Sequence, residues 1–148
     1  MQTKLQQQCL DLTFLSLSVI QKDEFLQKLK LNLINFSEKH PQNNAVKKLI
    51  HSIHLSDLRK KDWEIFKSSF EQVFPAFFNN LHSLYPQLTA KELRHCALIR
   101  LNIPPFDCAQ IMGISLESIH KARHRLRKKI GLNRKEQLEG FLLSLTEE

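Results

Sequence analysis

The chain has 148 residues and a formal net charge of +7, and hydrophobic residues make up 42% of it. This apolar fraction excludes disorder along the whole length, and the length suits one domain or one domain with an extension. Because only three Gly and five Pro are present, the chain has little material for hairpins or barrels, and we expect an all-α fold.

The composition also indicates the compartment. Cys9, Cys96 and Cys108 have no CxxC spacing, so neither a disulfide framework nor a zinc site is expected, and Cys96 and Cys108 fit small core positions. No run of 18 apolar residues occurs, and the N-terminus lacks the form of a secretory signal. We therefore expect a cytoplasmic protein whose chain makes no membrane contact.

The first two segments are apolar and favour helices. In residues 4–21 one set of apolar residues has heptad spacing, as in a helix, while residues 15–19 alternate as in a strand. The scarcity of Gly favours the helix. Residues 23–36 carry a clearer helical stripe. The seam consists of Leu5, Cys9, Leu12, Ser16 and Val19, and the stripe of Phe25, Leu26, Leu29, Leu33 and Phe36.

A turn-rich break at residues 38–44 precedes a helix whose apolar face ends at Ile53. Residues 63–85 then hold seven of the twelve aromatic residues. Their helical spacing predicts two helices, with Pro75 in the first turn of the second. An aromatic ladder is also a candidate base-stacking surface, but the low charge here favours a hydrophobic core or a dimer interface.

After Pro86 the pattern predicts a compact unit of four helices. Thr89 and Glu92 form a capping box at the first helix. Pro104 and Pro105 open a short second helix, and Gly113 supplies the positive φ of the turn that follows. Ser115 caps the third helix, and Gly131 ends it. Residues 133–136 offer a cap before the last helix. We therefore divide the chain into a helical extension, 1–85, and a domain, 86–148.

The third helix of this domain is strongly basic. Between Ser118 and Lys135 there are eight Lys or Arg and no Asp or Glu. Within it, apolar residues recur at helical spacing and would face inward. A short helix, a Gly-containing turn and a longer helix form a helix-turn-helix, whose second helix, here 115–130, enters the major groove of double-stranded DNA. The inward residues are Ile119, Ala122, Leu126 and Ile130.

The outward side chains of this helix fall into two groups. Those near its N-terminal half would reach base edges, and the others would contact phosphates, which set affinity but not sequence preference. A helix that is merely soluble usually mixes acids with bases, so the missing acids favour DNA. Arg123 lies beside the apolar face, and we expect a structural ion pair there, with Glu92 as the candidate partner. The base group is His120, Lys121 and His124, and the phosphate group is Arg125, Arg127, Lys128 and Lys129.

These motifs together resemble a known family. The pattern Leu88-Thr89-x-x-Glu92, the segment 108–119 and the run 127–132 resemble the LuxR-type helix-turn-helix of bacterial transcription regulators, over about residues 86–146. The aromatic helices before Pro86 are similar to the effector end of large bacterial sensor-regulators, so the chain is either such an effector region or a short stand-alone regulator. Departures from the family pattern are Pro104 where Ser is common, Asp107 and Cys108 where Glu and Ile are common, and His120 and His124 beside Lys121.

The resemblance implies a transcription regulator that binds DNA as a homodimer, often through its last helix. In this chain the corresponding dimerisation residues are Leu138, Phe141, Leu142 and Leu145. Two alternatives stay open. One is a sigma-factor-like region that contacts promoter DNA and RNA polymerase together. The other is an interaction module with a degenerate helix-turn-helix.

The sequence offers no sign of catalysis. It has no Gly-rich phosphate loop, no nucleophile elbow and no pair of carboxylates in a polar cluster. His120 and His124 have the spacing of helical metal ligands, but neighbouring cations repel a metal ion. We therefore expect no enzymatic activity, no cofactor and no metal.

Overall fold

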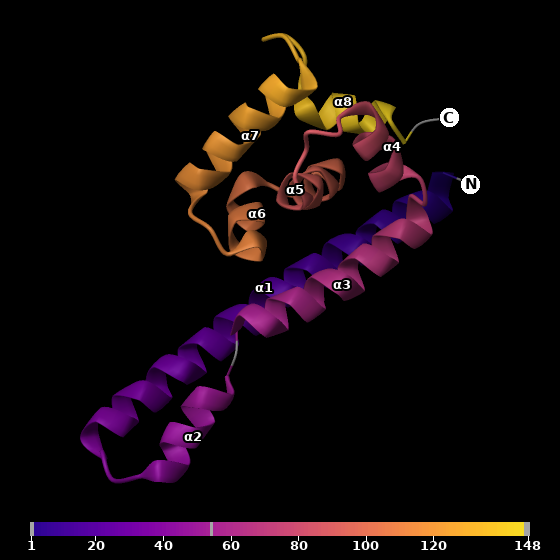
Figure 1. Ribbon diagram of the computed structural model, residues 1–148. Coiled ribbons are helices and arrows are strands. Elements are labelled where there is room, and N and C mark those ends of the chain that lie inside the picture. Colours follow the sequence, from indigo (N-terminus) through magenta and orange to yellow (C-terminus); the bar gives the residue numbers. More distant parts are fainter. Residues whose placement is uncertain (1, 54, 147–148) are drawn as a thin grey trace.

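The computed structural model describes residues 2–53 and 55–146 (Figure 1). In this part of the chain there are eight helices and no strand, which confirms the predicted all-α fold. In chain order the helices are α1 (Gln2–Lys39), α2 (Asn44–Ser52), α3 (Leu55–Val73), α4 (Phe77–Leu84), α5 (Ala90–Arg100), α6 (Pro105–Met112), α7 (Leu116–Ile130) and α8 (Leu138–Ser144).

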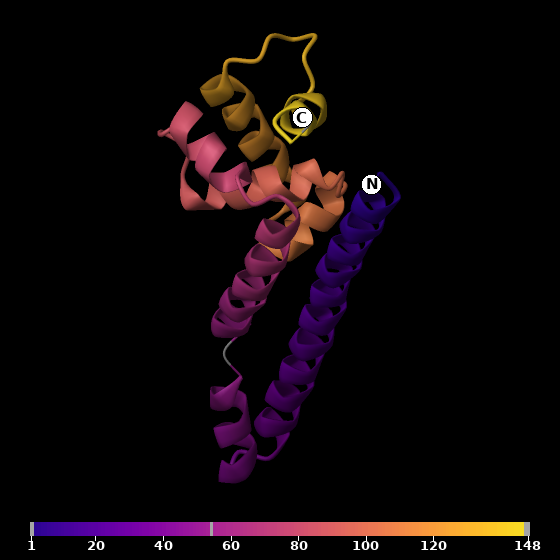
Figure 2. The same ribbon diagram turned by 90° about the vertical axis from the view of Figure 1, so that its right-hand side faces the viewer.

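The helices form a long arm and a compact head. In both views α1 and α3 run side by side, and α2 folds back along the far end of α1 (Figures 1 and 2). Helices α4 to α8 gather at the other end of the arm, where α6 contacts α1 (Figure 1). The head is therefore joined to the arm in two ways: α3 leads directly into it, and α1 packs against α6.

Residues 2–39 form one helix, which contains both segments that the sequence assigned to helix, 4–21 and 23–36. Residues 21–23 contain neither Gly nor Pro, so nothing in the backbone interrupts the helix. Lys22 also lies at this point, with its Nζ 2.6 Å from Oδ1 of Asp62 on α3. The middle of the predicted seam faces the core, since Leu12 and Ser16 are buried.

The stripe predicted over residues 23–36 is not a core face. Phe25, Leu29 and Phe36 are exposed, and Leu26 and Leu33 are half-buried. Of the described part of the chain, the nine-residue helix α2 and the start of α3 lie beside this part of α1 (Figure 1), and no other described element covers its opposite side. The outer side of α1 nearer the head is also apolar and exposed, at Leu10 and Phe14.

The aromatic residues of α3 and α4 form the centre of the core, as the low charge of this segment predicted. Phe70 is fully buried, and its ring centroid lies 5.1 Å from those of Phe74 and Phe77 and 5.4 Å from that of Phe78. One detail differs: Pro75 lies in the turn between the helices rather than in the first turn of α4, whose N-cap is Ala76.

The core continues from the arm into the head without a break. Leu12 of α1, Phe70 of α3, Leu98 of α5, Leu126 of α7 and Leu142 of α8 all belong to one cluster of buried side chains. The domain boundary after residue 85 stays a prediction, and apolar packing crosses it. Among the described residues, no helix is both long enough and apolar enough to cross a membrane.

Two of the three cysteines belong to this core, as predicted. Cys96 and Cys108 are fully buried. Burial raises the pKa of each thiol to about 12. Both therefore stay protonated at neutral pH and act as small apolar side chains.

Phe70→Ala should lower the free energy of unfolding by about 3–5 kcal/mol, because it leaves a cavity among four other aromatic rings. Phe106 on α6 is 59% exposed, so Phe106→Ala is the matched control and should change stability by less than about 0.5 kcal/mol. Urea unfolding followed by circular dichroism measures both. Equal losses in the two variants would contradict the assignment of Phe70 to the core.

Candidate nucleic-acid interface

Helices α6 and α7 are joined by a tight turn formed by residues 113–115. Pro104 is the N-cap of α6 and Pro105 its first residue, so the missing N–H groups fall where the helix needs none. Gly113 has a φ of +69°, and the N–H of Ile114 donates to the carbonyl oxygen of Ala109 at 3.0 Å. This left-handed glycine ends α6 and reverses the chain, as the sequence predicted.

Helix α7 is capped at both ends and fixed along one side. Oγ of Ser115 accepts from the N–H of Ser118 at 3.1 Å, and Gly131 ends the helix with a φ of +84°. Ile119 and Leu126 are fully buried, and Ile130 is 8% exposed. The predicted inward face is confirmed at these three positions, while the fourth, Ala122, is half-buried.

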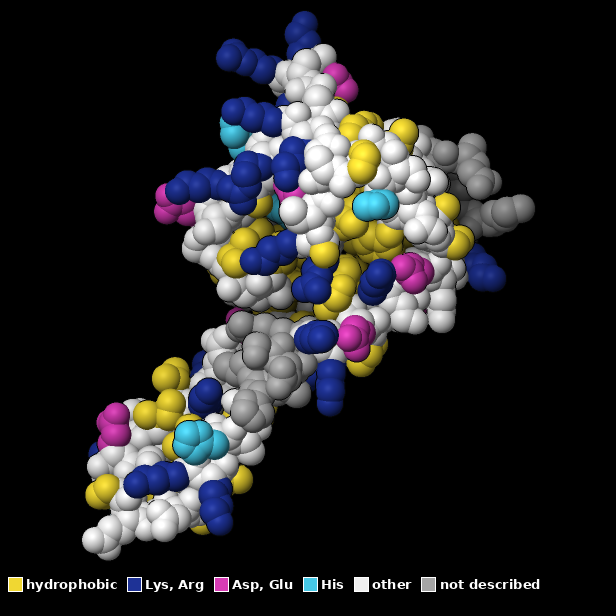
Figure 3. All heavy atoms as spheres, in the orientation of Figure 1, with side chains coloured by type: hydrophobic (Ala, Val, Ile, Leu, Met, Phe, Trp, Pro, Cys, Tyr) yellow, Lys and Arg dark blue, Asp and Glu magenta, His cyan; other side chains and the backbone are white. Residues whose placement is uncertain are grey.

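The opposite side of α7 is exposed and basic. Figure 3 shows Lys and Arg side chains gathered over this helix, at the upper left of the molecule. Lys121 also carries an i,i+4 contact, with its Nζ 3.3 Å from Oε1 of Glu117. A shallow surface depression runs along the first half of this side, over residues 116–125. The candidate residues that are exposed here are His120, Lys121, His124, Arg125 and Lys128.

The two remaining candidates, Arg127 and Lys129, make contacts within the chain. The guanidinium of Arg127 donates to the carbonyl oxygens of Asn133 and Glu136 at 2.6 and 2.7 Å. Nζ of Lys129 lies 2.7 Å from Oε1 of Glu92 on α5. Arg127 therefore holds the loop after α7, and Lys129 joins α7 to α5. Any phosphate contact by either residue would compete with these bonds.

Arg123 forms a structural ion pair, but the predicted partner is wrong. Its guanidinium bonds to Glu139 of α8, whereas Glu92 bonds to Lys129. Arg123 lies on the flank of α7 that faces α8, and Lys129 lies on the flank that faces α5. Position along a single helix did not reveal which neighbouring helix each flank would meet.

The capping box of α5 is present as predicted. Oγ1 of Thr89 accepts from the N–H of Glu92, and a carboxylate oxygen of Glu92 accepts from the N–H of Thr89. Partial burial alone would raise the pKa of Glu92, but the bonds from Lys129 and Thr89 outweigh it and hold the pKa below its usual value. One carboxylate thus caps α5 and anchors α7.

Helix α8 contributes mainly to the core. Leu138 and Leu142 are 1% and 0% exposed in the single chain. Phe141 is half-buried with its ring against Tyr85, and Leu145 is also half-buried. Leu138 and Leu142 therefore have no surface left to offer a second copy in this conformation, and the predicted dimerisation face reduces to the edges of Phe141 and Leu145.

The cap predicted at residues 133–136 closes a turn instead of opening α8. Oδ1 of Asn133 accepts from the N–H groups of Lys135 and Glu136 at 2.9 and 3.0 Å. Helix α8 begins two residues after this turn, at Leu138.

Sequence reasoning did not single out several polar residues of α5. His95 is 1% exposed, and its Nε2 has no hydrogen-bond partner among the described residues. Burial, with a further contribution from the charge of Arg123, lowers the pKa of His95 to about 4. Arg94 lies against Trp63 of α3, with its guanidinium carbon 5.0 Å from the centroid of the ring, and Lys91 lines the same cavity. The i,i+3 spacing of these two residues is visible in the sequence, but the contact of Arg94 with α3 is not.

Comparison with known proteins identifies no relative. No protein-family model, no curated protein and no solved structure matches the chain. Within the described residues, no group of three or more His, Cys, Asp or Glu is placed to hold a metal ion.

Acidification from pH 7 to 4.5 should destabilise the fold through His95. The unfolded chain binds a proton at this imidazole below about pH 6.5, whereas the native state resists protonation down to about pH 4. The stabilisation is therefore complete above pH 6.5 and is lost as the pH falls, by about 2–3 kcal/mol at pH 4.5.

Denaturant unfolding at both pH values measures this loss. In His95→Leu the loss between pH 7 and 4.5 should be smaller by that amount. His82 is exposed on α4, and His82→Gln should retain the wild-type pH dependence. An unchanged pH dependence in His95→Leu would show that His95 does not carry the effect.

Proposed function

We propose that this chain is a sequence-specific DNA-binding transcriptional regulator that reads the major groove with α7. The single observation that carries the proposal is the division of α7 into two sides. One side is buried at Ile119 and Leu126, and the other exposes Lys121, Arg125 and Lys128. A rigid helix with one basic side is the element that major-groove readers insert.

The surroundings of α7 support the same role. The turn at Gly113 and the Ser115 cap fix the N-terminal end of the helix, where base-reading side chains would lie. The resemblance of residues 86–146 to the LuxR-type helix-turn-helix points to the same use of the same helix. Arg125 and Lys128 from two copies would make about four phosphate contacts, which would give a log–log slope of affinity against salt of about −4.

The candidate DNA-contacting residues differ in whether their side chains are exposed or bonded within the chain. His120, Lys121 and His124 are exposed on the first half of α7 and suit base edges. Arg125 and Lys128 are exposed and suit phosphates. Arg127 and Lys129 hold the loop and α5, so we assign them to the support of α7 rather than to the main contact with DNA.

We further propose that the regulator acts as a homodimer through the outer side of α1. Leu10, Phe14 and Leu17 are exposed there at steps of four and three residues, the spacing of a helix-pair seam. Between Leu5 and Gln21 the one charged residue is Asp11, so two copies could pack without repulsion between like charges. These three side chains are exposed, whereas Phe141 and Leu145 of α8 are half-buried.

Selection of bound duplexes from a random library at near-physiological salt tests the DNA proposal. Wild type should enrich one motif, as an inverted repeat if the protein binds as a dimer. Lys121→Gln should change the preferred bases, and Lys128→Gln should weaken all sequences together, by about 3- to 10-fold. Lys48 is exposed on α2, and Lys48→Gln removes the same charge without affecting α7.

Failure to enrich any motif would overturn sequence-specific binding and favour the interaction-module alternative. A uniform loss of affinity in both α7 variants would instead refute Lys121 as a base-reading residue. RNA polymerase retained by the protein in the absence of DNA would favour the sigma-like alternative.

Phe14→Glu should weaken the dimer by about 100-fold or more, because each of the two copies loses about 1.5–3 kcal/mol of apolar burial. Sedimentation velocity over a range of concentrations measures the change. Phe106→Glu places the same charge on an exposed Phe of α6 and should leave the association constant unchanged. A dimer that is insensitive to Phe14→Glu would move the interface away from α1.

A further inference from the structure

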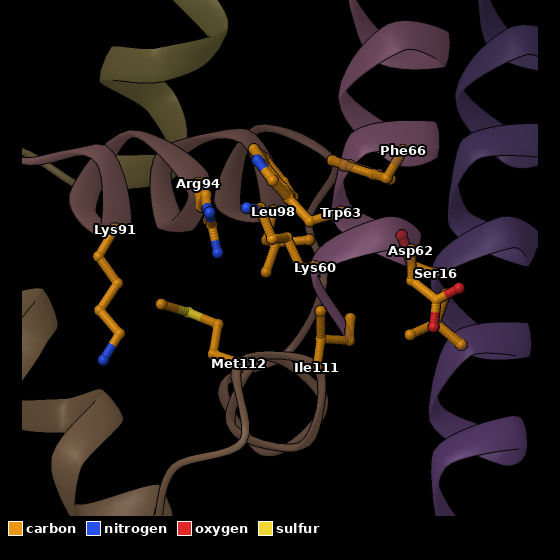
Figure 4. Close-up of a pocket in the computed structure, with 11 residues that line it drawn as sticks. Ser16, Lys60, Asp62, Trp63, Phe66, Lys91, Arg94, Leu98, Ile111 and Met112 are labelled. Carbon is orange, nitrogen blue, oxygen red and sulfur yellow. The ribbon is translucent and has the colours of Figure 1, made fainter. Parts of the chain in front are cut away.

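A cavity of about 370 Å³ lies where the arm meets the head. Helices α1 and α3 form one side of it, and α5 and α6 form the other (Figure 4). Its size falls within the range of small-molecule sites, about 300–1,000 Å³. No residue proposed above for DNA contact or dimerisation lines it.

The walls of the cavity are mainly apolar. Trp63 and Phe66 come from α3, Leu98 from α5, and Ile111 and Met112 from α6. Trp63 is half-buried and Phe66 is 4% exposed. Such a lining suits an apolar chain or ring and offers few partners to a polar group.

Positive charge is concentrated at one side of this apolar space. Arg94 extends from α5 toward Met112, Lys91 lies at the end of the cavity away from α1 (Figure 4), and Lys60 of α3 also lines the cavity. The Arg94 guanidinium carbon lies 5.0 Å from the Trp63 ring centroid, a cation–π contact that leaves its donors available. The buried Nε of Arg94 has no hydrogen-bond partner among the described residues.

The acidic residue in the lining does not balance this charge. Asp62 is paired with Lys22, whose Nζ lies 2.6 Å from its Oδ1. In Figure 4, Asp62 and Ser16 lie at the α1 side of the cavity, away from Lys91. An anion near Arg94 and Lys91 would therefore meet positive charge that Asp62 does not neutralise, and the guanidinium of Arg94 could donate a charge-assisted hydrogen bond to it.

We propose that this cavity binds an amphipathic carboxylate, with its apolar chain among Trp63, Leu98 and Met112 and its head group at Arg94 and Lys91. A nucleotide fits less well, because its base and sugar need several hydrogen-bond partners that the apolar walls do not supply. A neutral apolar molecule would contact the apolar walls but would make no use of the positive charge of Arg94 and Lys91.

The position of the cavity gives such a ligand a regulatory role, and this consequence rests on the proposed DNA binding. Ile111 and Met112 are the last two residues of α6 and directly precede Gly113. A ligand that contacts α3 and the end of α6 together would favour one arrangement of arm and head over others. Its binding would then be coupled to DNA binding by α7, with equal effects in both directions.

Trp63 is the one tryptophan of the chain, so its fluorescence reports directly on the cavity. The full chain is titrated without DNA with decanoate, kept below its micelle concentration, and in parallel with decanol and with acetate. We expect a saturable change with decanoate, affinity at least about 10-fold weaker for decanol, and no response to acetate. Decanol binding as tightly as decanoate, or no saturable response to decanoate, would overturn the proposal.

Substitutions test the location of the head group. Lys91→Gln and Arg94→Gln should each weaken decanoate binding by about 10-fold, and Lys48→Gln should leave it unchanged. Arg94 contacts Trp63, so calorimetry replaces fluorescence for that variant, and Lys91→Gln provides an independent test. Wild-type affinity in both cavity variants would refute the assigned site. Because these titrations contain no DNA, their failure is distinct from a failure of the duplex selection.

Discussion

The burial of one side of α7 is the constraint on which the rest of the head depends. Ile119 and Leu126 are fully enclosed, and each such side chain contributes about 1.5–3 kcal/mol when it leaves water. No rotation of the helix about its axis can keep them buried and also turn the basic side inward. The charge of this segment therefore faces solvent because its apolar residues are held by α6 and the core, and the caps at Ser115 and Gly131 set where the helix begins and ends.

The basic run of α7 serves two purposes that the sequence does not distinguish. The cations on its flanks bond within the chain, since Arg123 meets Glu139, Lys129 meets Glu92, and Arg127 holds the loop at Asn133 and Glu136. The cations farthest from the core stay exposed. A basic side chain at the edge of the apolar face lies close to polar groups of neighbouring helices and can bond to them. A basic side chain opposite that face has no such neighbours and stays exposed.

The arm and the head share one core, and this has consequences for communication between them. The aromatic cluster around Phe70 joins α3 to α4, and Leu12 brings α1 into the same set of contacts. Where the two parts meet less closely, the packing leaves the cavity between Trp63 and Met112. The joint thus combines a tightly packed region around Phe70 with an apolar space that a ligand could fill.

The sequence by itself determined the features that depend on near neighbours. Helical periodicity indicated most of the helices, although α3 begins at Leu55 and not near Trp63. The capping box at Thr89, the turn at Gly113 and the end of α7 at Gly131 follow from local backbone preferences. Periodicity also identified which side of α7 is apolar. The segments 4–21 and 23–36 join into one helix because no Gly or Pro lies between them.

Only the tertiary structure decided what depends on distant partners. It showed that Arg123 pairs with Glu139 and not with Glu92, that Leu138 and Leu142 lie inside the core, and that Phe25 on α1 is exposed. It also brought Trp63, Arg94 and Met112 around one cavity. Each of these outcomes depends on which helices meet across the fold, and the spacing of residues along one helix carries no information about that.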